Sequence, residues 1–289
     1  MVQVRSSIAV NHHVEKFLDN FDFLPYTVEN FDKKSLFPTI FFGLYTLNDY
    51  MALRFHRGPC LIFWLGTDVT ILLEGLGPYG TGYFQGLIKS KNAIHICQNE
   101  LLRQELESVG IDAQVRPLFM ASLDTFTTCY KYKKRPSVYT MVSSNKYEFY
   151  GIPWIYEIAD QADVDFYIYG YEGEDTSNVF HFPYLPEDKF NEQIKEHQAF
   201  LRLPEHDGIS QSTMKAILMG QYVCDRIEYP FTEHVTSPQE VLEFVNSLYL
   251  RQLSNDLSEL MKKSINNFDW LVTFKETYEH LMIEEEDEW

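Results

Sequence analysis

The stretch FLRLPEHDGISQSTMKAILMGQYVCD, residues 200–225, decides the fold class of this chain. It predicts, in order, a buried strand, a polar turn, a helix and a second strand. A strand that enters a helix through a Gly-containing turn directs free backbone N–H groups and the positive end of the helix dipole at a bound anion. The stretch therefore predicts an anion site, most often a phosphate site. Its four pieces are a strand over 200–203, a turn with Asp207 and Gly208, a helix over about 212–219 that ends at Gly220, and a strand over 222–224.

The strand, helix, strand order recurs on both sides of residue 135, which predicts two α/β domains with parallel sheets. Such units cross over right-handed and place their ligand loops at the carboxyl ends of the strands. We expect domains over 1–130 and 136–250, with helices over 251–289 that pack back on the first domain. The expected strands before the opening stretch are 39–42, 60–65, 93–97, 113–118, 138–142, 165–169 and 179–182. The expected helices are 47–56, 99–109, 152–162, 186–197 and one that begins after Ser237.

Residues 75–86 are rich in Gly and Tyr, which predicts a mobile loop before a short helix that reaches Lys89. Such a loop can cover a ligand. Its aromatic side chains Tyr79, Tyr83 and Phe84 either form a platform for an acceptor or pack into the core, the commoner fate of such residues.

The charge balance argues against binding to polyanions. The 289 residues include 42 acidic and 24 basic side chains, which gives a formal net charge of -18. This charge repels nucleic acid and anionic lipid at long range unless a local basic patch overrides it. The dense basic run KYKKR at 131–135 is interpreted as a solvated linker between the domains. Nucleic acid is therefore an unfavoured partner.

The cysteines Cys60, Cys97, Cys129 and Cys224 form no CxxC pair, which favours free thiols in a reducing compartment over disulfides or a zinc site. No apolar run approaches the roughly 18 residues of a membrane span, and the first residues lack a signal peptide's apolar stretch. We expect a cytoplasmic protein without a metal. Peripheral membrane contact stays open, although the sequence shows no basic amphipathic helix that would support it.

A family resemblance rests on the same stretch. DGISQSTMKAILMG, followed by QYV, resembles the signature of retaining nucleotide-sugar glycosyltransferases of the family-4 type. In that signature an acidic residue and Gly open a loop and a helix, and an Ala-rich turn, a Gly and a strand follow. Three other places agree, and the likeness covers most of residues 60–285. They are GTD at 66–68, QNELLRQELESVGIDAQVRPL at 98–118, and FDWLVTFKETYEH at 268–280.

The resemblance implies a GT-B fold, in which two Rossmann-like domains face each other across a cleft and the second domain holds most of the sugar donor. Asp207 takes the place of the first Glu in the family's pattern of Glu, seven residues and Glu, and Gly208 follows it as expected. The donor would be a nucleoside diphosphate sugar such as a UDP- or GDP-sugar, with no cofactor. The acceptor would be a hydroxyl of a glycan, a lipid-linked molecule or a small molecule.

The sequence departs from the family pattern at two positions. The second Glu of the pattern, which commonly contacts the nucleotide ribose, is Lys215 here, and the His that often precedes the GTD-like turn is Leu65. Placed in the first turn of a helix, an exposed lysine opposes the dipole at a cost of about 0.3 to 1 kcal/mol, which a bound diphosphate would reverse. The alternative is a lysine that points to solvent.

Each candidate residue also has a structural interpretation. Asp207 can orient hydroxyls of the transferred sugar or form a turn before Gly. Asp68 can face the cleft from the acceptor side or cap a helix. Arg202 and Lys146 each lie at the carboxyl end of a predicted strand, where they can pair with phosphate oxygens. The expected catalytic residues are Asp207, Asp68 and Lys146, and the expected donor-binding residues are Arg202, Gly208, Ile209, Ser210, Gln211, Ser212 and Lys215.

Two functions of different classes follow from this reading. The first is transfer of a sugar to an acceptor hydroxyl, with retention of anomeric configuration and without a metal, in which backbone N–H groups and basic side chains stabilise the leaving diphosphate. The second is noncatalytic binding of a nucleotide sugar or glycan on a degenerate GT-B scaffold, which Lys215 and Leu65 favour. Glycosylation of DNA bases is a weaker third reading, because the net charge opposes DNA binding.

Overall fold

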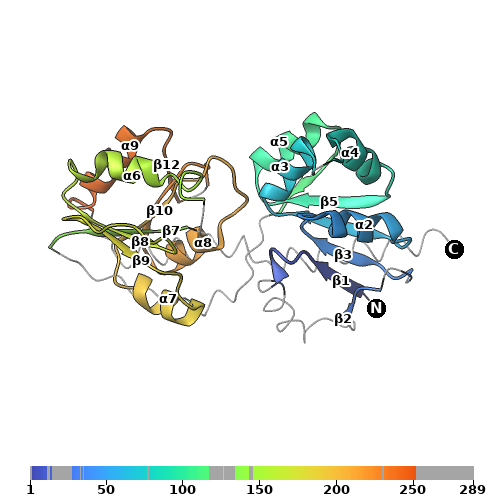
Figure 1. The fold of residues 1–289 in the computed structure, drawn as a ribbon, viewed down its shortest axis with the longest axis horizontal. Helices are drawn as coiled ribbons and strands as arrows, with labels where there is room; N and C mark the ends of the chain where they lie inside the picture. The colour runs from blue at the N-terminus through green and yellow to red at the C-terminus, as the bar shows by residue number, and fades with distance from the viewer. Residues whose placement is uncertain are drawn as a thin grey trace. The chain divides into compact units, whose positions relative to one another are not determined.

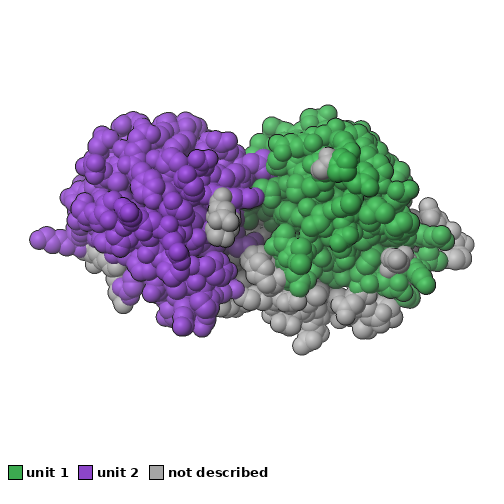
Figure 2. Space-filling view, viewed as in Figure 1, with its two compact units in different colours: residues 1–121, 207–209, 268–289 green, residues 122–206, 210–267 purple. Residues whose placement is uncertain are grey.

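A computed structural model describes residues 2–11, 14, 28–32, 34, 36–76, 78–116, 126, 134–142, 146–229 and 231–251. The described chain forms two compact units, each built on its own sheet (Figures 1 and 2). Unit 1 contains the described residues up to 116 together with Asp207–Ile209, and unit 2 contains the other described residues from 126 to 251.

Unit 1 has a sheet of parallel strands in the order β2-β1-β3-β4-β5-β6. Its order reverses between β1 and β3, as in a doubly wound sheet. The strands are β1 Val2–Ser6, β2 Val28–Asn30, β3 Thr39–Phe42, β4 Cys60–Trp64, β5 Ala93–Cys97 and β6 Gln114–Val115. The helices are α2 Leu47–Phe55, α3 Thr67–Glu74, α4 Thr81–Lys89 and α5 Glu100–Ser108.

Unit 2 has a second parallel sheet in the order β12-β11-β10-β7-β8-β9. Helices α6 and α9 lie on one face of this sheet and α7 on the other (Figure 1). The strands are β7 Ser137–Met141, β8 Asp165–Tyr169, β9 Val179–Phe182, β10 Ala199–Arg202, β11 Tyr222–Asp225 and β12 Glu233–His234. The helices are α6 Ile152–Ala159, α7 Glu187–Ile194, α8 Gln211–Leu218 and α9 Pro238–Ser247.

The cores of both units follow from apolar residues at strand and helix spacing. In β4, Ile62 and Trp64 alternate toward helices α3 and α5, where they form one cluster with Leu72, Leu102 and Leu106. Removing such side chains from water is the main favourable term in folding, about 25 cal/mol per Å² of apolar surface. In unit 2 the same role falls to a cluster that joins β7, β8, β10 and β11 to α6 and α9.

The predicted α/β class with two parallel sheets is confirmed. Long apolar runs such as β4 were the surest signal, since strands buried on both faces are continuously apolar. Strands β1 and β2 were not predicted. β1 ends in Arg5 and Ser6 and β2 has 3 residues, so neither carries the continuous apolar run that marked β4.

The expectation of a mobile loop over residues 75–86 is wrong, because helix α4 begins at Thr81. Phe84 and Ile88, one turn apart, are fully buried and hold the helix on the core. Gly82 and Gly86 lie in this helix where an added Cβ would meet nothing within 4 Å. Of the glycines in this stretch, Gly75 has a positive φ of 89°. Gly82 and Gly86 therefore lie within a helix, and the glycines of this stretch do not indicate a loop after Gly80.

Some expectations concern residues outside the described ones. The C-terminal helices expected over 251–289 and residues Lys131, Tyr132 and Lys133 of the expected linker belong to this group, and so does Cys129. Three described cysteines, Cys60, Cys97 and Cys224, are free and buried.

A matched pair of glycine variants tests the helical assignment of residues 81–89. Gly86→Ala should raise the free energy of unfolding by up to about 1 kcal/mol, because alanine is the better helix former and the site is open. Gly75→Ala should lower the free energy of unfolding by about 1 kcal/mol or more. Alanine at positive φ is strained, and its Cβ would lie 2.8 Å from the Tyr79 carbonyl oxygen. Urea unfolding of both variants gives the values. Destabilisation by Gly86→Ala would contradict a helix there.

Candidate functional site

The strand order of unit 2 reverses between β7 and β10, which lie side by side. The loops that follow these two strands leave the sheet toward opposite faces, and ligands of open α/β sheets bind in the crevice at this point. Residues 142–151 follow β7 and residues 203–210 follow β10. The candidate site is therefore the carboxyl edge of the sheet in unit 2.

Two of the predicted basic residues lie at this edge, each against an aromatic ring. Arg202 is the last residue of β10, and its Cζ lies 5.0 Å from the centre of the Tyr150 ring. Lys146 is exposed in the loop after β7, with its Nζ 5.9 Å from the centre of the Phe149 ring. A ring face attracts a cation electrostatically and so helps to fix its position. The structure thus brings both residues to the expected edge.

A third cation, Arg226, was not predicted. It follows β11, and its Cζ lies 4.3 Å from the centre of the Trp154 ring, the shortest of these three distances. Its guanidinium donates to the Leu203 carbonyl oxygen at 3.4 Å and lies 3.5 Å from a Glu205 carboxylate oxygen. Arg226 is therefore tied to the loop after β10. A single Arg after a short strand has no periodic signal, but its place one residue after β11 follows the same rule that singled out Arg202.

The first turn of α8 supplies the polar groups that the opening stretch predicted. Ser210 is the N-cap, and its side chain accepts a hydrogen bond from the Thr213 N–H at 3.3 Å, as N-cap residues do. Gln211 and Ser212 open the helix. Thr213 Oγ1 donates to the buried carboxylate of Asp225 at 3.1 Å, which fixes the start of α8 to the end of β11.

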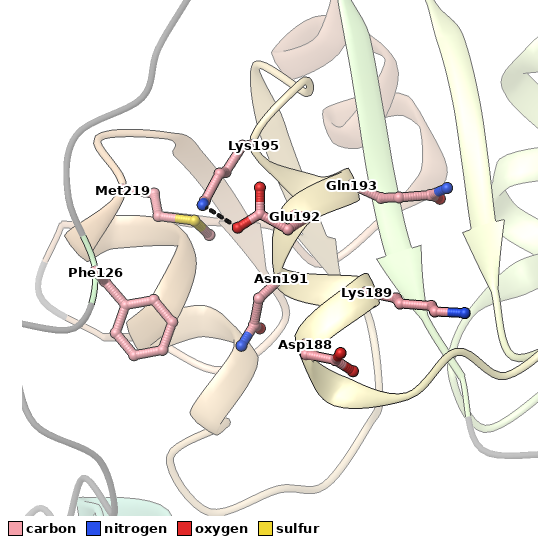
Figure 3. Close-up of a pocket in the computed structure, with 8 residues that line it drawn as sticks. All are labelled: Phe126, Asp188, Lys189, Asn191, Glu192, Gln193, Lys195 and Met219. Carbon is pink, nitrogen blue, oxygen red and sulfur yellow. Dashed lines mark hydrogen bonds and ion pairs between the residues drawn. The ribbon is translucent and has the colours of Figure 1, made fainter.

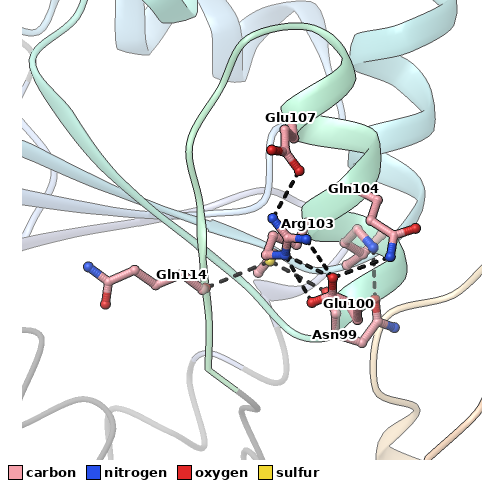
Figure 4. Close-up of polar contacts among 8 residues, drawn as sticks. Asn99, Glu100, Arg103, Gln104, Glu107 and Gln114 are labelled. Carbon is pink, nitrogen blue, oxygen red and sulfur yellow. Dashed lines mark hydrogen bonds and ion pairs between the residues drawn. The ribbon is translucent and has the colours of Figure 1, made fainter.

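Asp207–Ile209, which precede this helix, belong to unit 1 by their contacts. The Asp207 carbonyl accepts from Asn99 Nδ2 at 3.1 Å, and the Ile209 N–H donates to Gln98 Oε1 at 2.5 Å. Asn99 also caps helix α5, whose exposed face carries ion pairs of Arg103 (Figure 4). A ligand that used the Ile209 N–H would have to displace Gln98.

Glycine is required where this short segment meets the GTD turn. A Cβ on Gly208 would lie 2.1 Å from the Leu65 carbonyl oxygen, and a Cβ on Gly66 would lie 2.7 Å from the Gly208 nitrogen. Gly66 also has a φ of 142°, which side chains rarely adopt. Gly208 therefore has a packing reason to be glycine as well as the one that the resemblance implies.

Asp68 is fully buried at the start of α3 and binds backbone amides. Its carboxylate accepts from the N–H groups of Leu65 at 3.0 Å, Gly66 at 2.8 Å and Val69 at 3.1 Å. Burial raises the pKa of Asp68 to about 6, against the lowering effect of these hydrogen bonds. The geometry matches the capping interpretation of this residue, with the carboxylate holding the GTD turn in place.

The position of Lys215 in its helix differs from the expectation. It lies in the last turn of α8 and not in the first, because α8 begins at Gln211, so the helix dipole favours its charge. Its Nζ lies 2.7 Å from a carboxylate oxygen of Glu187, the first residue of α7, and 5.5 Å from the centre of the Phe126 ring. Because α7 follows β9, this contact places the ammonium at the carboxyl edge of the sheet. Lys215 is buried and ion-paired, which contradicts a lysine pointing to solvent.

The aromatic residues predicted as an acceptor platform divide into two groups. Phe84 is fully buried, whereas Tyr79 and Tyr83 are 41% and 36% exposed. Their rings are 5.3 Å apart, and Tyr83 accepts a hydrogen bond from Arg54 Nη1 at 2.7 Å. Phe84 therefore belongs to the core, and the two tyrosines form part of the surface.

A hollow of about 500 Å³ in unit 2 lies beside α7 (Figure 3). It is lined by residues of α7, among them Asn191 and the ion-paired Glu192 and Lys195, and by Phe126 and Met219. Because its lining runs from Asp188, near the start of α7, to Lys195 and Met219, the hollow extends along the length of this helix. The ring centre of its lining residue Phe126 lies 5.5 Å from Lys215 Nζ, so the hollow adjoins the pair of Lys215 and Glu187.

No protein-family profile matches the sequence, and no curated protein matches it. Solved structures do. The chain is similar to the pneumococcal O-GlcNAc transferase GtfA, solved with UDP and GlcNAc, at a TM-score of 0.55 and 13% identity over 85% of this chain and 57% of GtfA. It is similar to Anabaena HepE, solved with UDP and glucose, at a TM-score of 0.62 and 9% identity over 97% of this chain and 98% of HepE.

A third similar structure is the UDP-forming α,α-trehalose-phosphate synthase of Burkholderia vietnamiensis, at a TM-score of 0.60 and 10% identity over 87% of this chain and 73% of that chain. The chain spans little more than half the length of GtfA. These proteins are GT-B glycosyltransferases, and the likeness shows a GT-B-like fold for this chain. At such identities it shows the fold alone, since one fold serves many functions.

The buried carboxyl of Asp68 should make stability depend on pH. The raised pKa means that the folded state favours protonated Asp68 more than the unfolded state does. The stability that Asp68 contributes in this way is therefore present below about pH 4 and is lost as pH rises through about 6. The unfolding free energy of the wild type, minus that of Asp68→Asn, should fall by about 2 kcal/mol between pH 4.5 and 7.5. Urea unfolding at both pH values measures it. A difference that stays constant would contradict the raised pKa.

Proposed function

We propose that this protein transfers a sugar from a nucleoside diphosphate sugar to an acceptor hydroxyl, with retention of anomeric configuration and without an essential metal. The observation that carries the proposal is the arrangement at the carboxyl edge of unit 2. There Lys146 follows β7, Arg202 ends β10, Arg226 follows β11, and the start of α8 comes after β10. In a chain of net charge -18, such an arrangement favours a diphosphate.

The donor diphosphate is held, in this proposal, by Lys146 and Arg202 from opposite sides of the switch point. The start of α8 supplies backbone N–H groups and the side chains of Ser210, Gln211 and Ser212. Gly208 keeps the turn before α8 packed against the Leu65 carbonyl oxygen, and the ammonium of Lys215 adds a further positive charge from the same edge. The Ile209 N–H can bind the donor after its hydrogen bond to Gln98 Oε1 is broken.

The reaction breaks the bond between the sugar's anomeric carbon and the diphosphate oxygen and forms a bond from that carbon to the acceptor oxygen. The electron pair of the broken bond stays with the diphosphate, and the acceptor's hydroxyl proton goes to it. Lys146 and Arg202 stabilise the charge that develops on the leaving group. Asp207 orients hydroxyls of the transferred sugar. Asp68 acts as a positioning residue that holds the GTD turn on the acceptor side.

Uridine nucleotides are the first donors to test, because GtfA and HepE were both solved with UDP. The acceptor is a hydroxyl of a glycan, a lipid-linked molecule or a small molecule. The free, buried cysteines Cys60, Cys97 and Cys224 favour a reducing, cytoplasmic setting. Among the described residues, no helix is long and apolar enough to cross a membrane.

A noncatalytic nucleotide-sugar binding protein is the second candidate, and specific observations favour it. Lys215 stands where the resemblance expects a Glu, and its ammonium is ion-paired with Glu187. Leu65 stands where a His is often found, and the Asp68 carboxylate is occupied by backbone amides. This candidate shares the donor site with the first and differs in lacking turnover.

Donor binding should depend on Arg202. With UDP at about 100 times its dissociation constant the wild type should gain about 2.7 kcal/mol of stability. Arg202→Ala should weaken binding about tenfold or more, because it removes a charged partner of the diphosphate. Arg135→Ala is the matched control, since it removes the same charge at the amino end of β7 in the same sheet. Thermal shift and calorimetry with UDP-, GDP-, ADP- and TDP-sugars measure the effect.

The two candidates separate on product formation. A glycosylated product that depends on Asp207 removes the noncatalytic reading. Binding without turnover of any donor supports it. If no nucleotide sugar binds, or if Arg135→Ala weakens binding as much as Arg202→Ala, the proposed site is wrong.

The pair of Lys215 and Glu187 tests whether the departure from the family pattern serves the donor. Lys215→Met removes the cation and keeps an unbranched apolar stem beside Phe126, and should weaken donor binding about tenfold. Glu187→Gln breaks the same ion pair but keeps the cation, so donor binding should stay equal or improve. Equal loss in both variants would mean that the pair acts only through the fold. Calorimetry with the donor, together with urea unfolding, distinguishes these results.

A further inference from the structure

Three large apolar side chains of unit 1 are exposed close together. Leu36 is 66% exposed, Phe37 46% and Phe55 52%. The link between them is Gly58, where an added Cβ would lie 2.3 Å from the Leu36 carbonyl oxygen and 2.8 Å from that of Phe37. Because Phe55 ends helix α2 three positions before Gly58, the backbone segments that carry the three side chains lie in one region. We call them the apolar rim.

Basic side chains adjoin the apolar rim. Arg54 and Arg57 flank Phe55 and are exposed. Lys91 Nζ donates to the carbonyl oxygens of Arg54 at 3.1 Å and His56 at 2.7 Å, which ties the chain after α4 to the end of α2. Lys89 is exposed at the end of α4, and together with Lys91 it lines a hollow of about 560 Å³. We call Arg54, Arg57, Lys89 and Lys91 the basic rim.

The basic rim lies where α2 and α4 end and β4 and β5 begin, which is the amino edge of the sheet in unit 1. Cations are favoured at the ends of helices by the helix dipole, and this accounts for part of the charge. Asp112, which lines the same hollow, offsets part of it. The dipole does not account for the exposed Leu36, Phe37 and Phe55 beside the cations. A monomer in water gains nothing from leaving these three side chains unburied.

We propose that the apolar and basic rims form a docking surface for an anionic lipid bilayer. Each Lys or Arg held near such a surface strengthens binding about fivefold, equivalent to about 1 kcal/mol. Exposed Leu and Phe side chains insert at the boundary between headgroups and acyl chains. Tyr79 and Tyr83, which Arg54 joins to the basic rim through its bond to the Tyr83 hydroxyl, are side chains typical of that boundary.

The negative charge of the whole chain restricts binding of an anionic bilayer to a face where cations are concentrated. At a net charge of -18 the protein as a whole is repelled by an anionic surface, so binding requires one face with concentrated cations. The exposed aliphatic and aromatic side chains beside the cations favour a bilayer, whose acyl boundary can take up all three of them. The docking surface is independent of the proposed sugar transfer, because its residues lie at the opposite edge of their sheet from the GTD turn.

Co-sedimentation of the full chain with vesicles tests the proposal. At low salt the wild type should bind vesicles of phosphatidylcholine that contain about 30% phosphatidylglycerol. It should bind vesicles of pure phosphatidylcholine much more weakly. The variant R57E/K89E should bind about 25-fold more weakly or worse, at about fivefold for each lost cation. Leu36→Asn should also weaken binding at a given salt concentration. Circular dichroism melting confirms that each variant is folded.

Matched controls lie in unit 2. K134E/K189E reverses two exposed lysines and changes the net charge by the same -4, from -18 to -22, and it should bind vesicles like the wild type. Leu250→Asn changes a leucine that is 89% exposed, with no expected effect. The proposal is overturned if the wild type does not bind anionic vesicles, or if the controls lose as much binding as the rim variants. It is also overturned if R57E/K89E abolishes self-association of the wild type while vesicle binding is absent.

Discussion

Strand β10 pairs in parallel with β7, with Ala199 opposite Val138 and Phe200 opposite Tyr139, and the candidate site of unit 2 depends on this pairing. It joins the two halves of the sheet at the point where strand order reverses. The loops after both strands therefore start from one edge with a crevice between them. Arg202 is in place because it ends one of the two paired strands. Without this pairing, Lys146 after β7 and Arg202 at the end of β10 would not lie at the same edge of one sheet.

Buried aspartates play similar parts in the two units. Asp225 ends β11 and binds Thr213 Oγ1 and the Ile227 N–H, and Asp68 follows β4 and binds backbone amides. In each case a carboxylate that would be costly to bury alone is compensated by hydrogen bonds, and the loop it binds gains a defined conformation. Each acts on a loop at the carboxyl edge of its own sheet. Asp225 and Asp68 therefore fix the conformation of loops at these edges, and this role does not require contact with a substrate.

The sequence predicted the fold better than it predicted the surface. Continuous apolar runs such as β4 and the stretch from β10 to β11 are determined by burial, which sequence periodicity reports directly. The helix expected to reach Lys89 was predicted too short because Gly82 and Gly86 suggested a loop, whereas the buried Phe84 and Ile88 outweigh the glycines' poor helix propensity. The direction in which a side chain points was less predictable. The pairing of Lys215 with Glu187 joins two helices that are far apart in sequence, and no local pattern contains that information.

The central claim is that a nucleotide sugar binds at the carboxyl edge of the sheet in unit 2, and amide hydrogen exchange with and without a bound nucleotide sugar tests it most directly. The account predicts slower exchange in peptides that contain residues 146–151 and 203–212, the loops after β7 and β10 with the start of α8. Slowed exchange confined to the residues of α7 that line the hollow, or no change in any peptide at a saturating concentration of the ligand, would contradict the account.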